Sequence, residues 1–216
     1  MRHPLHELTV DPPLVRALLR EQHPDLAEHP LVVAAAGWDN VTVRLGADLA
    51  VRLPVRAEAA RLVEHEQHWL LLLAPSIPVP VPVPVRTGRP GAGYPWRWSI
   101  VPWLAGTPAD AVSPADRDPW AEQLAVVLAA LHRAATDGAP RNRYRGVPLA
   151  ARDEAVAVRI AGSPDAAVLG PLWRDGLAAP DRDGPAVWLH GDPPGQPAHG
   201  RWTAGRRPGL RRRHGR

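Results

Sequence analysis

Cysteine, lysine and phenylalanine are absent from this chain of 216 residues, and methionine occurs once. Without cysteine, the chain can form neither disulfides nor thiolate metal sites. No apolar run is long enough to span a bilayer, and the N-terminus lacks the charged-then-apolar pattern of a secretory signal. We therefore expect a cytoplasmic protein without a membrane partner. The length suits one domain, or two small lobes that share a cleft.

Acidic residues and asparagine are missing from the last part of the chain. Residues 193–216 contain seven Arg and no Asp, Glu or Asn, whereas residues 1–192 carry 19 Arg against 22 acidic residues, a net charge of −3. The formal net charge of +4 therefore arises wholly in the C-terminal part. Such a basic segment can bind nucleic acid or an anionic surface. We favour the other interpretation, a disordered charged tail.

The first half of the chain predicts a helix, a three-stranded β-meander and a second helix. Asp11 before two prolines starts an amphipathic helix within residues 3–30. Short apolar, β-branched runs separated by turn residues indicate three strands. An alanine- and leucine-rich stretch with helical spacing follows. The strands are expected at 31–36, 41–45 and 49–53, and the second helix at 57–74.

The second half predicts extended segments and further helices. Alternating Val and Pro at 75–84 excludes a central strand, because proline lacks the N–H that a sheet needs. The remaining elements are expected as a turn at 86–93, a strand at 94–104, helices at 119–136, 150–160 and 165–178, and a short buried strand at 186–189.

The triplet His190-Gly191-Asp192 follows the last of these strands. Titratable groups at the end of a buried strand are a common way to build an active site. An ordinary turn is the alternative for this triplet taken alone. The order of the preceding elements decides between these interpretations.

That order resembles the aminoglycoside phosphotransferase family, whose fold is similar to that of protein kinases. The resemblance implies an α+β fold with a small antiparallel lobe at 1–103, a partial helical lobe at 104–192 and the tail at 193–216. Several short segments are similar to sequence motifs of that family. They are Asp39-Asn40, Val51-Arg52-Leu53-Pro54, Gly93-Tyr94-Pro95-Trp96 and Pro148-Leu149-Ala150-Ala151-Arg152-Asp153.

The resemblance implies a phosphoryl transfer from ATP or GTP, with Mg²⁺, to a hydroxyl of an aminoglycoside-like small molecule. Asp192 would be the catalytic base, and His190 would brace its loop. Arg52, at the place where protein kinases have lysine, would contact the α- and β-phosphates. The alternative for Arg52 is a surface residue on an edge strand.

The resemblance also assigns residues around Arg52. Glu66 would pair with Arg52, with Glu64 as its competitor; both could instead lie on a solvated helix face. The strand entering the interlobe hinge would offer backbone groups to the purine. Its residues are Ser99, Ile100, Val101 and Trp103.

The sequence departs from the family after Asp192. The family continues with a Pro, a metal-binding Asn and, after an apolar strand, Asp-Phe-Gly, whose Asp is the main metal ligand. Here Pro193-Pro194-Gly195-Gln196-Pro197 follows, so we assign no metal ligand. We expect impaired transfer and uncovered apolar faces in the helical lobe. A nucleotide-binding module without catalysis is the main alternative, ahead of a nucleic-acid binder that uses the tail.

The tail itself is interpreted as an out-of-frame translation. Residues 194–216 can be encoded by GC-rich codons which, read one nucleotide later, spell Pro-Gly-Asn-Leu-Leu-Thr-Ala-Asp-Gly-Arg-Leu-Ala-Gly-Val-Leu-Asp-Phe-Gly-Asp-Val-Thr-Ala. That string contains the missing Asn, an apolar strand and Asp-Phe-Gly in the order of the family. A net loss of two nucleotides after codon 192 would account for the shift.

Overall fold

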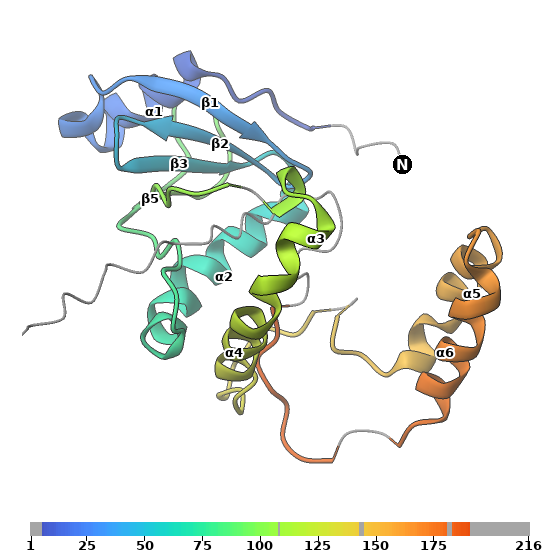
Figure 1. The fold of residues 1–216 in the computed structure, drawn as a ribbon. Helices are drawn as coiled ribbons and strands as arrows, with labels where there is room; N and C mark the ends of the chain where they lie inside the picture. The colour runs from blue at the N-terminus through green and yellow to red at the C-terminus, as the bar shows by residue number, and fades with distance from the viewer. Residues whose placement is uncertain (1–5, 108, 143–144, 181–182, 191–216) are drawn as a thin grey trace, which may run out of the picture. The chain divides into compact units, whose positions relative to one another are not determined.

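The computed structural model describes residues 6–107, 109–142, 145–180 and 183–190 (Figure 1). The predictions for Asp192 and for the tail lie outside these ranges. The described residues form two compact units, 6–131 and 132–190. The division expected at residues 103 and 104 stays a prediction. No helix in the described ranges is long and apolar enough to cross a membrane.

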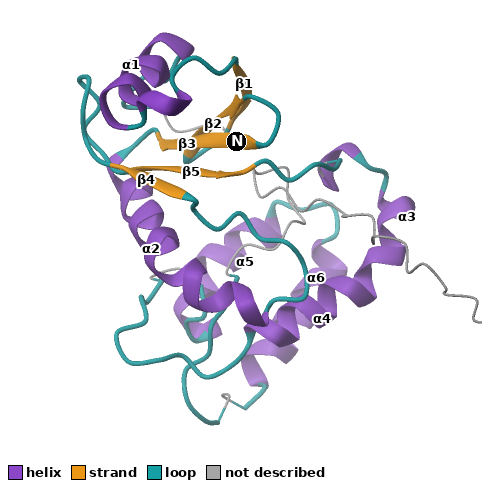
Figure 2. Cartoon of the chain, turned by 90° about the vertical axis from the view of Figure 1, so that its left-hand side faces the viewer, coloured by secondary structure: helices purple, strands orange, loops and turns teal. Residues whose placement is uncertain are grey.

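The first unit contains a five-stranded sheet and most of the helices (Figure 2). The strand order is β1-β2-β3-β5-β4, and each neighbouring pair is antiparallel. The strands are β1 Leu31–Ala36, β2 Asn40–Leu45, β3 Leu49–Pro54, β4 Arg86–Gly88 and β5 Trp98–Pro102. The helices are α1 Pro12–Gln22, α2 Ala57–Leu73, α3 Pro114–Arg117 and α4 Ala121–Leu131, with short 3-10 turns at Pro24–Leu26, Ala74–Ser76, Ala109–Ala111 and Asp118–Trp120.

Helix α1 covers one face of the sheet. Its N-cap is Asp11, whose side chain accepts the N–H of Leu14 at 2.9 Å, and proline occupies its first turn. Val15, Leu18 and Leu19 are spaced to share one helix face, and all three are fully buried in the core. Burying each of these side chains stabilises the fold by about 1.5–3 kcal/mol.

Helix α2 lies on the opposite side of the sheet from α1 (Figures 1 and 2). Its buried residues near the sheet are small, namely Ala59, Ala60 and Val63. Small side chains let the helix axis approach the sheet closely, so that longer polar side chains one turn further on can reach the strands. The end of β3, just before α2, is held by Tyr94, whose hydroxyl donates to the carbonyl of Pro54 at 2.6 Å. Burial raises the pKa of Tyr94.

The predicted helix–meander–helix order is confirmed: the first helix lies within the expected range, and the boundaries of the three strands and the second helix differ from prediction by at most one residue. The segment 75–84 forms no strand, as its prolines predicted. Two expectations need correction. The expected turn at 86–93 contains strand β4, which pairs with β5, and the strand expected at 94–104 is limited to Trp98–Pro102. The 91–94 segment instead closes on itself, since the N–H of Gly91 and that of Tyr94 each donate to the other's carbonyl.

Gly88 in β4 has no room for a side chain. A Cβ there would lie 1.9 Å from Cε2 of Trp98, which is fully buried and donates its indole N–H to the carbonyl of Arg89 at 3.0 Å. We expect Gly88→Ala to lower the free energy of unfolding by about 1–3 kcal/mol, the usual cost of overpacking. Urea denaturation checks this, with the exposed neighbour Thr87→Ala as the control. Equal stability of the two variants would contradict the packing at Gly88.

The second unit is mainly helical. It contains a 3-10 turn at Leu149–Arg152 and helices α5 Asp153–Ala161 and α6 Ala166–Ala178, close to their predicted ranges. Neither helix has a buried residue. Apolar side chains such as Val158, Val168 and Leu172 are more than 60% exposed, in line with the uncovered faces expected from the sequence.

Two expectations in this part of the chain need correction in their extent. The helix expected at 119–136 ends at Leu131, because the next residues pair with a distant segment. Ala135 donates its N–H to the carbonyl of Ala186 at 2.8 Å, and Trp188 donates to that of Arg133 at 3.0 Å. The strand expected at 186–189 is a single bridge at Val187, and Leu189 is 43% exposed. The segment 186–189 pairs through its main chain with residues 133–135. So short a partner cannot bury both faces of residues 186–189.

Candidate functional site

The sheet face that carries α2 brings together most of the predicted site residues. Strand residues alternate between the faces, so Val51 and Leu53 enter the core on the α1 side while Arg52 points to the other face. Across the sheet, Arg52 lies opposite Thr42 of β2 and Ser99 of β5. Arg52 therefore stands on the third of five strands, not on an edge strand.

Arg52 and Glu66 form a two-point ion pair. The distances are 2.7 Å from Nη1 to Oε2 and 3.3 Å from Nη2 to Oε1. The side chains are 22% and 31% exposed, respectively. Glu66 follows the buried Val63 by three residues, which places it on the same side of α2. The expected pairing is thus present, while its role in binding a nucleotide stays a prediction.

The competing residue Glu64 lies on a different side of the helix. Its carboxylate is 3.8 Å from Nε of Arg97, and both side chains are more than half exposed. Such an exposed pair contributes little to stability. The geometry therefore favours Glu66 over Glu64 as the partner of Arg52.

Gln67 is a site residue that the sequence did not reveal. Its Nε2 donates to the carbonyl of Trp98 at 2.9 Å and to Oγ of Ser99 at 3.0 Å. Ser99 is 1% exposed, so this contact satisfies a buried hydroxyl. Because Gln67 adjoins Glu66, one helical turn is attached to both β3 and β5. Gln67 lies four residues after Val63 and therefore on the same side of the helix, and this spacing is the signal that could have identified it.

The predicted purine-contact residues differ in their surroundings. Ile100 faces the core on the α1 side, and its carbonyl accepts the N–H of Val85 at 2.8 Å. Val101 pairs with Ala50 in the ladder, and Trp103 donates its N–H to the carbonyl of Asp48 at 2.7 Å. Contact of these backbone groups with a purine stays a prediction. The prediction missed Arg44, whose guanidinium lies 5.0 Å from the centre of a Trp103 ring.

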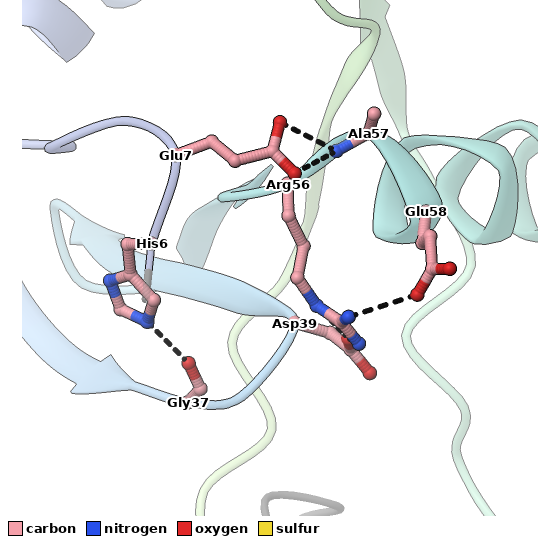
Figure 3. A network of polar contacts seen from close by, with 7 residues as sticks. All are labelled: His6, Glu7, Gly37, Asp39, Arg56, Ala57 and Glu58. Atoms are coloured by element: carbon pink, nitrogen blue, oxygen red, sulfur yellow. Dashed lines mark hydrogen bonds and ion pairs between the residues drawn. The ribbon is translucent and has the colours of Figure 1, made fainter. Parts of the chain in front are cut away.

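The turn between β1 and β2 is attached to the start of α2 and to the N-terminal segment (Figure 3). Arg56 donates to Asp39 in the turn and to Glu58 in the first turn of α2. His6 contacts the carbonyl of Gly37 at 3.0 Å. These contacts join segments that are far apart in the sequence.

The predicted catalytic residues are only partly described. His190 is exposed and follows the bridge at Val187, within the second unit. Asp192 lies outside the described residues. Their predicted roles are therefore untested. In the described ranges, no three His, Asp or Glu side chains gather as a metal site would require.

A polar hollow of about 360 Å³ lies elsewhere on the first unit, and none of its lining residues belongs to the predicted site. Burial lowers the pKa of His23 in its wall. The lining residues are Glu21, Gln22, His23, Thr87, Gly88, Arg89 and Arg97.

Comparisons with known proteins agree with this fold. The model of the phosphotransferase enzyme family matches residues 30–194. The GDP complex of wild-type aminoglycoside 2'-phosphotransferase-IIIa is similar with a TM-score of 0.63 and 17% identity, over 85% of this chain and 65% of that one. The GDP and kanamycin complex of APH(2")-IIia gives 0.56 and 19%, over 76% and 58%. A search of curated proteins finds no match.

At such identities the likeness shows the fold, and the expected kinase-like α+β fold is confirmed. The chain spans less than two thirds of the length of either solved protein.

Proposed function

This chain belongs to the phosphotransferase enzyme family, and we propose that the sheet face around Arg52 binds a nucleoside triphosphate. The proposed reaction transfers the γ-phosphoryl group to a hydroxyl of a small molecule of the aminoglycoside type. The nucleotide is supported by similar proteins that are complexed with GDP, and the acceptor by one that is complexed with kanamycin.

The observation that carries the proposal is the ion pair between Arg52 and Glu66. A guanidinium has five N–H donors, and the two contacts with Glu66 use two of them. Glu66 thereby orients the planar group while leaving donors for phosphate oxygens, which Arg can hold at two points. The pair therefore holds a cationic group on the middle strand of the sheet, beside Thr42 and Ser99, where it can contact an anionic ligand.

Each residue has a chemical task in the proposed reaction. Arg52 offsets the negative charge of the α- and β-phosphates. Asp192 accepts the proton of the acceptor hydroxyl as its oxygen bonds to the γ-phosphorus. The bond from that phosphorus to the β–γ bridging oxygen breaks, and the nucleoside diphosphate leaves. His190 would brace the loop of Asp192.

Magnesium would supply further charge neutralisation in such a reaction. The described residues do not fit a metal site, since they offer no converging set of ligands. The sequence after Asp192 has no Asp, Glu or Asn either. The lack of metal ligands in both places favours a second candidate function, in which the chain binds a nucleotide without transferring phosphate. Nucleotide binding that does not depend on magnesium, with no transfer to any acceptor, would support this candidate.

Replacing Arg52 tests the proposed location directly. We expect Arg52→Ala to weaken binding of ATP or GTP about tenfold or more, because a charge-assisted phosphate contact is lost. Titration calorimetry of the 216-residue chain measures this affinity. The control is Arg20→Ala, which removes an exposed ion pair with Glu28. Equal affinities of Arg52→Ala and the parent would contradict the proposed location.

A further inference from the structure

The first N–H group of helix α2 is bonded by a residue from another part of the chain. The N-cap is Arg56, whose side chain cannot accept a hydrogen bond from the helix. The N–H of Ala57 instead donates to both carboxylate oxygens of Glu7 at 3.3 Å. Glu7 is held in place by its own N–H, which donates to the carbonyl of Val55 at 2.9 Å. The N-terminal segment thus completes the start of α2 (Figure 3).

The Arg56 guanidinium connects this helix start to the β1–β2 turn. Nε and Nη2 both donate to Oδ1 of Asp39, the former at 3.0 Å, and Nη1 donates to Glu58 at 3.0 Å. Arg56 is 20% exposed and Asp39 36%, whereas Glu58 is 82% exposed. The better-shielded contact with Asp39 is therefore the stronger of the two. The main chain adds a parallel link, since Val55 donates its N–H to the carbonyl of Asp39 at 3.0 Å.

The same turn is held from its other end by the N-terminal segment. His6 lies with Nε2 3.0 Å from the carbonyl of Gly37, so Nε2 carries the proton in this contact. Within the turn, the N–H of Gly37 donates to the carbonyl of Asn40 at 2.9 Å. The turn is therefore connected at both ends, and the connection to α2 is through Arg56 and Asp39.

We propose that Arg56 is a positioning residue for the nucleotide site, an inference that rests on the proposed function. Arg56 joins the β1–β2 turn to the helix that carries Glu66. The distance and orientation of the turn relative to the Arg52–Glu66 pair are thereby fixed. Ten residues of helix from Arg56 to Glu66 rise about 15 Å, too far for Arg56 to contact that pair itself. The turn ends at Asn40, which lies opposite Pro54, two residues along β3 from Arg52. The inference is that the bound nucleotide contacts both the turn and Arg52, and it then gains affinity because both contacts are placed before binding.

The test compares single and double variants by calorimetry with ATP. Arg56→Met keeps the apolar stem and removes the donors; we expect about fivefold weaker binding or more, the usual range of coupling between sites. If Arg56 acts through the Arg52–Glu66 pair, the double variant with Arg52→Ala should bind within about twofold of Arg52→Ala alone. The matched control is Arg86→Met, which removes another two-point pair, with Asp25 at 2.8 and 2.9 Å, and should bind as the parent does.

The outcomes separate this inference from the proposed function. Parental affinity in Arg56→Met, or fully additive losses in the double variant, would overturn the positioning role while leaving the proposed site intact. Parental affinity in Arg52→Ala would overturn the proposed site itself. Should Arg56→Met fail to fold, Asp39→Asn serves in its place, because it keeps an acceptor oxygen and removes only the charge. It should weaken binding in the same direction by a smaller factor, and an unchanged affinity would count against the inference.

Discussion

Inserting two nucleotides after codon 192 is expected to raise magnesium-dependent phosphotransfer by about 10²–10³-fold or more over the present chain. The shifted frame should supply the Asn and the Asp-Phe-Gly segment that the family has after its catalytic Asp. Metal-held charge neutralisation of the transferred phosphate is worth at least as much as a preorganised hydrogen-bond donor, whose loss costs about this factor. Transfer of labelled γ-phosphate to an aminoglycoside, with and without Mg²⁺, measures the gain.

Reading the gene comes first in that experiment. The shifted frame should stay open beyond codon 216 and continue into helical sequence. Inserting one nucleotide in place of two is the matched control. It creates the third reading frame and should give no gain in phosphotransfer. A stop codon within a few codons of the shifted frame, or a reading other than the predicted string, would show that the arginine-rich tail needs a function of its own.

Replacing Asp192 has the second large expected effect. In the frame-restored protein, Asp192→Asn should lower kcat by about 10²–10⁴-fold, the contribution of a general base. The affinity for ATP should stay within about twofold, because the base acts on the acceptor hydroxyl and not on the bound nucleotide. Steady-state kinetics together with calorimetry separates these two quantities.

The control for Asp192→Asn is Asp137→Asn, which makes the same change at an exposed turn. It should leave both kcat and the affinity unchanged. Near-parental turnover in Asp192→Asn would remove this residue from the chemistry. A parallel loss of nucleotide affinity would instead assign Asp192 to nucleotide binding.

Local sequence patterns were sufficient for the meander, whereas the pairing of Arg52 with Glu66 was expected from the family resemblance, with Glu64 as the competitor. Strand alternation places Arg52 opposite the core face that holds Val51 and Leu53, and helical spacing from Val63 points Glu66 toward the sheet. Each of these relations spans only a few residues along one element, and the structure shows that the two side chains meet.

The contacts that could not be predicted join segments far apart in the sequence. The bond from Ala57 to Glu7 spans 50 residues, and Arg56 reaches Asp39 across 17. Likewise, the turn residues from Asp137 onward, which set the predicted end of the helix, carry no information on the pairing of Ala135 with Ala186. Such partners compete with the local helical preference and are visible only in the folded chain.

Cross-linking of 2-azido-ATP to the 216-residue chain, followed by peptide mass spectrometry, tests the central claim most directly. The label should enter peptides from β2–β3 and from β5 to Trp103, and unlabelled ATP should suppress it. Arg52→Ala should reduce the labelling, whereas Arg20→Ala should not. Labelling confined to residues 193–216 or to the hollow around His23 and Arg89 would contradict a nucleotide site on the sheet face.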